Sequence, residues 1–166
     1  MVQTAHIPAI LPGIPNICCE SGFVHQPLVD TGFLVALYVR GDALHHAALT
    51  WLQQNRLPLQ TVAPVIVETC FFLDAPGKIA LLNWITQGGL TVAEIPVNSY
   101  SELAAYIQKY ADQDIDFADA ALVWLANKTG ERRILTVDEN DFQVYRIKGS
   151  HPFDLIQWYK HNLRGN

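Results

Sequence analysis

Acidic residues follow two short apolar segments, at positions where a catalytic or metal-binding group could act. Asp30 comes directly after Leu28-Val29, and Asp138 comes directly after the run 134–137. Such segments are typical of strands that are covered on both faces of a parallel sheet. Because ligands of open α/β sheets bind at the carboxyl ends of the strands, both carboxylates are candidates for a functional site. The structural alternatives are a helix N-cap for Asp30 and the start of a turn for Asp138.

Two further carboxylates fall on predicted helices. Glu68 is, apart from Thr69, the only polar residue of the apolar segment 65–73. A carboxylate in such a helix is costly unless it is paired, protonated or bound to a cation, so a salt bridge to an arginine is the structural alternative. Asp119 lies three residues after Asp116 and therefore on the same helix face. Here the alternatives are an N-cap for Asp116 and a favourable interaction of Asp119 with the helix dipole.

A parallel α/β sheet would let these four acids converge, although they come from distant parts of the chain. Clustered carboxylates repel one another, and a divalent cation removes that repulsion. Ligands that are all oxygen indicate Mg²⁺ or Mn²⁺ rather than zinc. One or two such ions can activate water and hold both oxygens of an in-line phosphoryl displacement. The residues therefore predict metal-dependent phosphoryl chemistry carried by a quartet: Asp30, Glu68, Asp119 and Asp138.

Other chemistries have little support in the sequence. It contains no Walker A or GxGxxG loop, no Gly-x-Ser-x-Gly element and no cysteine–histidine signature. Asp30-Thr31-Gly32 also occurs in aspartic proteases, but those are all-β proteins and the helical patterns here disagree. His45 and His46 are neighbours on a predicted helix and point in different directions, so we interpret them as solvated surface residues.

The elements that must position the quartet alternate between strand and helix. Strands are predicted at 28–29, 59–62, 90–95 and 134–137, with an edge strand at 144–147. Helices are predicted at 33–37, 43–55 after an Asp42 cap, 65–73, 78–87, 99–110, 117–128 and 153–161, with Asp141-Phe142 in a loop. This alternation predicts an α/β fold: a three-layer α/β/α sandwich around a central, mostly parallel sheet of four to five strands.

Composition bounds the domain organisation. The chain has 166 residues, of which 50% are hydrophobic and 16% charged, enough for one domain with a substantial core. Proline-rich, aperiodic residues 1–25 are expected to form an extended or disordered tail, and residues 26–166 a single domain. No apolar run is long enough to span a membrane. Three cysteines without a disulfide or metal spacing favour a reducing cytoplasm.

Four segments carry a resemblance to a known family. They are LVDTGFLVAL, VIVETCFFL, DFADAALVWLANKTG and RRILTVDENDF. Together they resemble the PIN (PilT N-terminus) domain family, including toxins of the VapC type, over about residues 27 to 148. The last two segments are the most specific. The long N-terminal tail departs from the compact toxins, which usually begin just before the first strand.

The resemblance implies both an activity and a set of site residues. Its usual activity is Mg²⁺- or Mn²⁺-dependent cleavage of RNA, often restrained by a small cognate antitoxin, and many members form dimers. The metal ligands implied by carry-over are Asp30, Glu68, Asp119 and Asp138, with Asp116 and Asp141 as additional members and the Thr31 and Thr136 hydroxyls in support. We therefore expect a toxin endoribonuclease acting on single-stranded RNA. The alternatives are a PIN-fold binding module without significant activity and a nuclease acting on DNA.

Charge and aromatic content add two weaker expectations. A net charge of −5 argues against a basic nucleic-acid-binding surface, but two divalent ions would offset most of it. The cations that could guide a substrate are Arg40, Arg132, Arg133, Arg146 and Lys148, which could equally form a solvated surface. Four tryptophans in a chain this apolar favour a homodimer that buries helix surface: Trp51, Trp84, Trp124 and Trp158.

Overall fold

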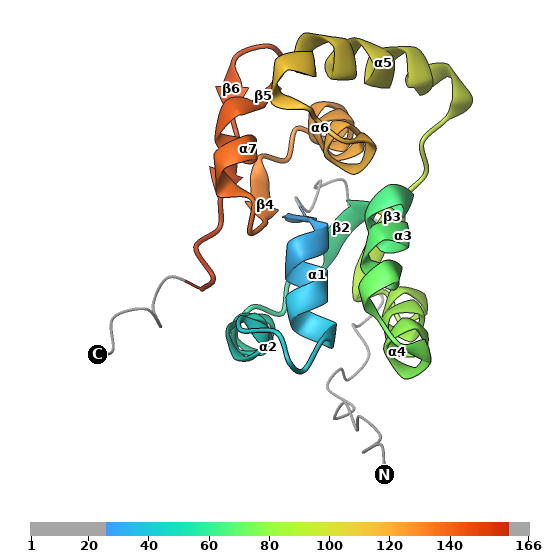
Figure 1. Ribbon diagram of the computed structural model, residues 1–166, viewed down its shortest axis with the longest axis vertical. Helices are drawn as coiled ribbons and strands as arrows, with labels where there is room; N and C mark the ends of the chain where they lie inside the picture. Colours follow the sequence, from blue (N-terminus) through green and yellow to red (C-terminus); the bar gives the residue numbers. More distant parts are fainter. Residues whose placement is uncertain (1–25, 160–166) are drawn as a thin grey trace, which may run out of the picture.

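Short apolar segments form a five-stranded parallel sheet in the order β3-β2-β1-β4-β7 (Figure 1). The computed structural model describes residues 26–159, so the prediction for residues 1–25 lies outside the described residues. The strands are β1 (Leu28–Val29), β2 (Leu59–Val62), β3 (Leu90–Ala93), β4 (Arg133–Leu135) and β7 (Asp154–Leu155). The predicted parallel sheet is confirmed. Its strands β3 and β4 end two residues earlier than expected.

The strand order places the helices on both faces of the sheet. From β1 the chain moves outward to β2 and β3, and then returns across β1 to reach β4. Because parallel crossovers are right-handed, the two directions put their helices on opposite faces. Figure 1 shows α5 and α6 on one side of the strands and α1, α2 and α4 on the other. The helices are α1 (Thr31–Tyr38), α2 (His45–Gln54), α3 (Ala63–Phe72), α4 (Ala75–Thr86), α5 (Tyr100–Lys109), α6 (Phe117–Thr129) and α7 (Glu139–Val144).

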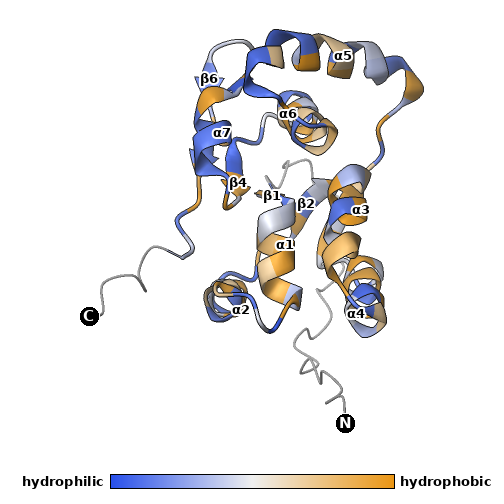
Figure 2. Ribbon diagram, in the orientation of Figure 1, coloured by the Kyte–Doolittle hydropathy of each residue, from blue (hydrophilic) through white to orange (hydrophobic). Residues whose placement is uncertain are grey.

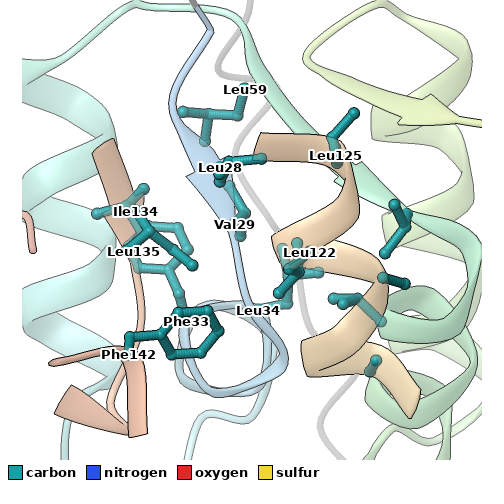
Figure 3. Close-up of a cluster of buried hydrophobic side chains, with 14 of the residues drawn as sticks. Leu28, Val29, Phe33, Leu34, Leu59, Leu122, Leu125, Ile134, Leu135 and Phe142 are labelled. Carbon is teal, nitrogen blue, oxygen red and sulfur yellow. The ribbon is translucent and has the colours of Figure 1, made fainter. Parts of the chain in front are cut away.

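The core forms around β1 and α6. Leu28 and Val29 are fully buried, and β1 lies between β2 and β4 in the middle of the sheet. Figure 3 shows Leu122 and Leu125 of α6 beside β1, with Phe33 and Leu34 of α1 close by. All of α6 from Ala120 to Ala126 is buried, which explains why this helix is apolar all round. The three-layer α/β/α sandwich is thus confirmed.

Helix ends follow their capping residues in most cases. The Asp116 carboxylate accepts a hydrogen bond from Asp119 N at 2.8 Å, and Gly130 ends α6 in the left-handed conformation with φ 75°. The prediction that Asp42 caps the second helix is wrong. Asp42 bonds Leu44 N at 2.7 Å, but the intervening turn delays the start of α2 to His45. His45 is half-buried rather than solvated, since its Nδ1 lies 2.8 Å from Ala36 O.

The segment after β4 differs from the prediction. Asp141 and Phe142 lie in helix α7 rather than in a loop. Figure 2 shows α7 mostly in the hydrophilic colour, which explains why its helical pattern is weak in the sequence. The expected edge strand 144–147 is reduced to β5 (Arg146–Ile147), which pairs antiparallel with β6 (His151–Pro152) in a separate two-stranded sheet.

The predicted helix 153–161 is wrong for the part that the structure describes. Asp154 N donates to Arg132 O at 2.8 Å and Ile156 N donates to Ile134 O at 2.9 Å, which adds β7 to the open edge of β4. Pairing satisfies an edge that would otherwise stay unpaired, and this tertiary gain outweighs local helix propensity. Within residues 26–159, none of the helices is long and apolar enough to cross a membrane.

Candidate active site

Asp30 is the buried centre of the acidic site. It follows β1, and its backbone N–H donates to Leu135 O of the neighbouring strand at 3.0 Å. Its side chain is only 3% exposed. One carboxylate oxygen accepts from Thr31 N at 2.6 Å, as expected of an N-cap, and the other accepts from Thr136 Oγ1 at 2.8 Å. These bonds use about half of the acceptor sites of a carboxylate, so both oxygens can still bind a cation.

The Thr136 hydroxyl joins the ends of the two central strands. It donates to Asp30 and accepts from the backbone N–H of Asp138 at 2.9 Å. Thr136 is buried, at 2% exposure. One hydroxyl therefore holds both the Asp30 carboxylate and the backbone that carries Asp138.

Gly32 lets α1 approach this strand end closely. A Cβ at Gly32 would overlap the side chain of Val137, which lies between Thr136 and Asp138. Any larger residue would push the start of α1 away from the end of β4. The glycine of the Asp-Thr-Gly sequence is thus required for packing of the site rather than for an unusual backbone angle.

Glu68 reaches the same site from α3. Its Oε2 accepts a hydrogen bond from Thr31 Oγ1 at 2.9 Å, so Thr31 contributes its N–H to Asp30 and its hydroxyl to Glu68. Among the described residues, the ion pairs involve Glu102, Glu131 and Asp154, and no arginine pairs with Glu68. The structural alternative raised from the sequence, a buried arginine salt bridge, is absent from the described part of the chain.

Asp119 is held by a tyrosine that the sequence did not single out. Tyr145 Oη donates to Asp119 Oδ2 at 3.0 Å. The Tyr145 ring is 1% exposed and packs edge-to-face against Tyr110 and Phe142, at centroid distances of 5.2 and 5.3 Å. The hydroxyl is therefore fixed by packing. Local sequence gave no signal for this role, because the contact spans 26 residues and depends on the turn after α7.

Burial raises the pKa of the candidate carboxylates, and the charges of neighbouring acids add to the shifts. Burial raises the pKa of Asp30 to about 7, assisted by the charges of Asp138 and Asp116 and opposed by the Thr136 and Thr31 hydrogen bonds. Burial and the charges of Asp30 and Asp116 raise the pKa of Asp119 to about 8. Without a cation, the cluster therefore retains protons near neutral pH.

The pKa values of the two outer acids, Glu68 and Asp138, are raised as well. Burial raises the pKa of Glu68, and the charge of Asp116 adds to this shift. Asp138 is exposed overall. Its carboxylate is nevertheless partly shielded from water, which raises its pKa, and the charges of Asp141 and Asp116 raise it further. The charge of Asp116 thus acts on Glu68 and Asp138, and that of Asp141 acts on Asp138.

The donor set suits a hard divalent cation. All candidate ligands are carboxylate oxygens, and their mutual repulsion is what a cation would relieve. As their side chains stand, the residues from 26 to 159 include no group of three or more His, Cys, Asp or Glu arranged to hold a metal ion. A cation at this site would need the outer carboxylates to turn toward Asp30, and it would displace protons from the cluster.

The predicted basic residues lie away from the acids or are engaged elsewhere. Arg132 pairs with Asp154 at 2.7 Å and Arg133 with Glu131 at 2.8 Å, both at the amino end of β4 and thus opposite Asp138. Arg40 follows the far end of α1. Two others lie after α7: Arg146, whose Nη1 donates to three nearby carbonyls, and the exposed Lys148.

Comparison with known proteins identifies the fold family. The PIN domain family matches residues 28–148. The chain belongs to the PIN domain family. It is 29% identical over 134 residues to "Ribonuclease VapC26" of Mycobacterium tuberculosis, covering 78% of this chain and 98% of that protein. The crystal structure of M. tuberculosis VapC20, titled a sarcin–ricin loop cleaving toxin, shares the fold with a TM-score of 0.63 at 20% identity, covering 70% of this chain and 94% of that one.

For this PIN domain, the resemblance found in the sequence is confirmed. The matched range begins at β1 and ends just after β5, so it contains every member of the acidic cluster. Two features of this chain lie beyond that range: strand β7 and the buried Trp158. The Trp158 Nε1–H donates a hydrogen bond to Thr136 O at 3.1 Å. The end of β4 is therefore supported by residues outside the family match.

Proposed function

We propose that this PIN domain is a Mg²⁺- or Mn²⁺-dependent endoribonuclease that cleaves single-stranded RNA. The observation that supports the proposal is a set of links around Asp30. Thr136 joins Asp30 to the backbone of Asp138, and Thr31 joins Asp30 to Glu68 of α3. Asp119 of α6 lies close enough for the charge of Asp30 to act on it. The printed names of the two VapC relatives, a ribonuclease and an RNA-loop-cleaving toxin, support RNA as the substrate.

The residues of the chain divide the work between binding and orientation. A bound Mg²⁺ or Mn²⁺ would supply Lewis-acid stabilisation of the charge that grows on the phosphate oxygens. Asp30 offers a carboxylate whose direction is fixed by Thr31 N and Thr136 Oγ1. Tyr145 fixes Asp119 in the same way. Such preorganised ligands need little rearrangement during the reaction, which is the main source of electrostatic catalysis.

A cleavage assay with single substitutions tests the activity. Purified protein is incubated with an unstructured RNA, and with DNA of the same sequence, in Mg²⁺ or Mn²⁺, with EDTA as the metal-free control. Asp30→Asn and Asp138→Asn should each lower RNA cleavage by at least about 100-fold, because each removes charge from the metal site. Cleavage that survives EDTA or both substitutions would refute the mechanism. Equal cleavage of the DNA would contradict RNA as the specific substrate and favour a nuclease that also acts on DNA.

We further propose that the nuclease is the cytoplasmic toxin of a toxin–antitoxin pair. The two VapC relatives support this role. A toxin that cleaves cellular RNA would need an inhibitor in the same cell, and a small antitoxin protein encoded beside it would serve. Induced expression of the chain should halt growth, and Asp30→Asn should abolish the effect. Normal growth with a folded, RNA-cleaving protein would remove the toxin role and leave the activity.

A homodimer completes the proposal, although the tryptophans no longer motivate it. Trp84, Trp124 and Trp158 are all at most 7% exposed, and the partly buried Trp51 packs against the same core. The support comes instead from the end of α3, where Phe71 is 82% and Phe72 64% exposed. A pair of exposed phenylalanines is unusual on a monomer surface. Light scattering should give twice the chain mass, and Phe71→Glu should give the monomer. A wild-type monomer at micromolar concentration would refute the dimer.

A further inference from the structure

A cavity of about 660 Å³ opens beside Glu68, and Asp30, Asp119 and Asp138 do not line it. It lies between the start of α3, the end of β3 and the first turns of α5 and α6. Its apolar walls include Val67, Ile95, Tyr100 and Phe117. This volume falls within the range of about 300–1,000 Å³ that is typical of pockets for small organic groups.

Two aromatic rings dominate one wall of this cavity. Tyr100 and Phe117 lie with their ring centroids 6.2 Å apart and an interplanar angle of 28°, in a stacked arrangement. Both rings remain open to solvent, at 51% and 40% exposure. They come from the starts of different helices and carry no role in the hydrophobic core. Exposed, nearly parallel rings form a platform for a further flat group.

The charge of the cavity decides which part of a nucleic acid can enter. Its charged lining residues are Glu68 and Glu94, and none of its lining residues is a lysine or arginine. A phosphate would be repelled by Glu94, because none of the lining residues offsets the charge of this carboxylate. A nucleobase is neutral and has a π-face for the rings and N–H groups for a carboxylate acceptor. The cavity therefore suits a base and excludes the phosphate backbone.

Glu68 connects the cavity to the proposed site of cleavage. It lines the cavity and also accepts a hydrogen bond from Thr31, whose backbone N–H binds Asp30. A base seated on Tyr100 and Phe117 would thus place its own phosphate beside the acidic cluster. This order, with the base in an apolar pocket and the phosphate at the carboxylates, requires an unpaired nucleotide whose base is free to leave its stack.

We propose that this cavity binds one unpaired nucleobase of the RNA, adjacent to the phosphate that is cleaved, by stacking on Tyr100 and Phe117. The proposal rests on the proposed ribonuclease function and adds its substrate subsite. Glu94 accepts hydrogen bonds but cannot donate them in its ionised form, so it favours base edges that present N–H groups. It thereby gives the site a means of base preference.

Binding is measured first, independently of cleavage. Short single-stranded RNAs, each with 2-aminopurine at one position, are titrated against full-length protein carrying Asp30→Asn, and a gel verifies that the RNA stays intact. Quenching of one position reports the stacked base. Tyr100→Leu and Phe117→Leu should each weaken binding about 5- to 100-fold and remove the quenching, in line with the loss of one stacked base. Tyr100→Phe should retain both.

Ile107→Ala is the control, because Ile107 is an exposed apolar residue of α5, the helix that carries Tyr100, and does not line the cavity. It should bind RNA like the parent protein. Circular dichroism of each variant establishes that it is folded. Unchanged affinity and quenching in folded Tyr100→Leu and Phe117→Leu would overturn the proposal, as would equal losses in Ile107→Ala.

Cleavage kinetics separate this proposal from the proposed function. In the otherwise unaltered enzyme, the two leucine variants should raise KM more than they lower kcat, and Glu94→Gln should change the preferred base at the cleavage position. If the protein cleaves RNA but these substitutions leave KM and base preference unchanged, the subsite is refuted and the nuclease stands. If no RNA is cleaved while 2-aminopurine quenching still depends on Tyr100, the subsite stands and the nuclease is refuted.

Discussion

Replacing Asp30 by asparagine should stabilise the metal-free protein while it removes activity. Burial raises the pKa of Asp30 from 3.8 to about 7. At about 1.4 kcal/mol per pH unit, the ionised side chain destabilises the fold by up to about 4 kcal/mol at pH 8. Asparagine has the shape of the protonated acid and carries no charge. In EDTA at pH 8, Asp30→Asn should therefore raise the free energy of unfolding by about 2–4 kcal/mol.

The direction of the Asp30 pKa shift determines the pH range over which Asp30→Asn and the wild type should differ in stability. Because the folded pKa of Asp30 lies above the unfolded value, the stability contributed by the neutral form is fully present below about pH 4. It is lost as the pH rises toward about 7, where the folded protein also ionises. The variant lacks this loss. The difference between variant and wild type should consequently be near zero at pH 4 and reach its full size above pH 7.

Urea unfolding at pH 5 and pH 8, with and without Mn²⁺, measures these quantities. Asp112→Asn is the matched control, because Asp112 is exposed and lies outside the acidic cluster; it should change stability by less than about 0.5 kcal/mol. Saturating Mn²⁺ should stabilise the wild type, by about 2.7 kcal/mol at a hundred times its dissociation constant, and stabilise Asp30→Asn much less. A variant that is less stable than the wild type at pH 8, or a difference that is equal at both pH values, would refute the reasoning.

Three further substitutions test the groups that hold the carboxylates. Thr136→Val removes the hydroxyl that binds Asp30 and should reduce cleavage about 10-fold or more, whereas Thr136→Ser should restore most of it; equal activity of the two variants would contradict the role. Tyr145→Phe keeps the ring packing but frees Asp119, so calorimetry should show weaker Mn²⁺ binding with little change in melting temperature; unchanged affinity would make the hydrogen bond irrelevant to the metal. Gly32→Ala should destabilise the protein by about 1–3 kcal/mol in chemical unfolding, despite the usual gain from alanine in a helix, and a stabilised variant would show that the strand end can yield.

The sequence predicted the parts of the site that depend on local pattern. Asp30 and Asp138 were recognisable because each follows an apolar strand, and Asp116 because it precedes an apolar helix. Glu68 was recognisable as an acid in an apolar helix. In each case the signal lies within a few residues of the side chain. The fold class followed from the same local patterns, since alternating strands and helices permit few arrangements.

The parts that the sequence did not predict depend on contacts between distant segments. Tyr145 meets Asp119 only because α7 and the turn after it return across α6, and no periodicity marks that path. Strand β7 forms because β4 leaves an open edge, although its residues also suit a helix. The ion pair between Arg132 and Asp154 depends on this strand, and it engages one of the arginines that the sequence suggested for substrate binding.

The bond between Thr136 and Asp30 has a consequence for the way the chain is synthesised. Its two residues lie 106 positions apart, so Asp30 leaves the ribosome long before the hydroxyl that orients it exists. At about 5–20 residues per second, translation takes about 5–20 seconds to cover that interval. Asp119 and Asp138 also belong to the later part of the chain. A nascent chain therefore carries no finished catalytic centre, and an mRNA broken before codon 136 can yield only harmless fragments of the proposed toxin.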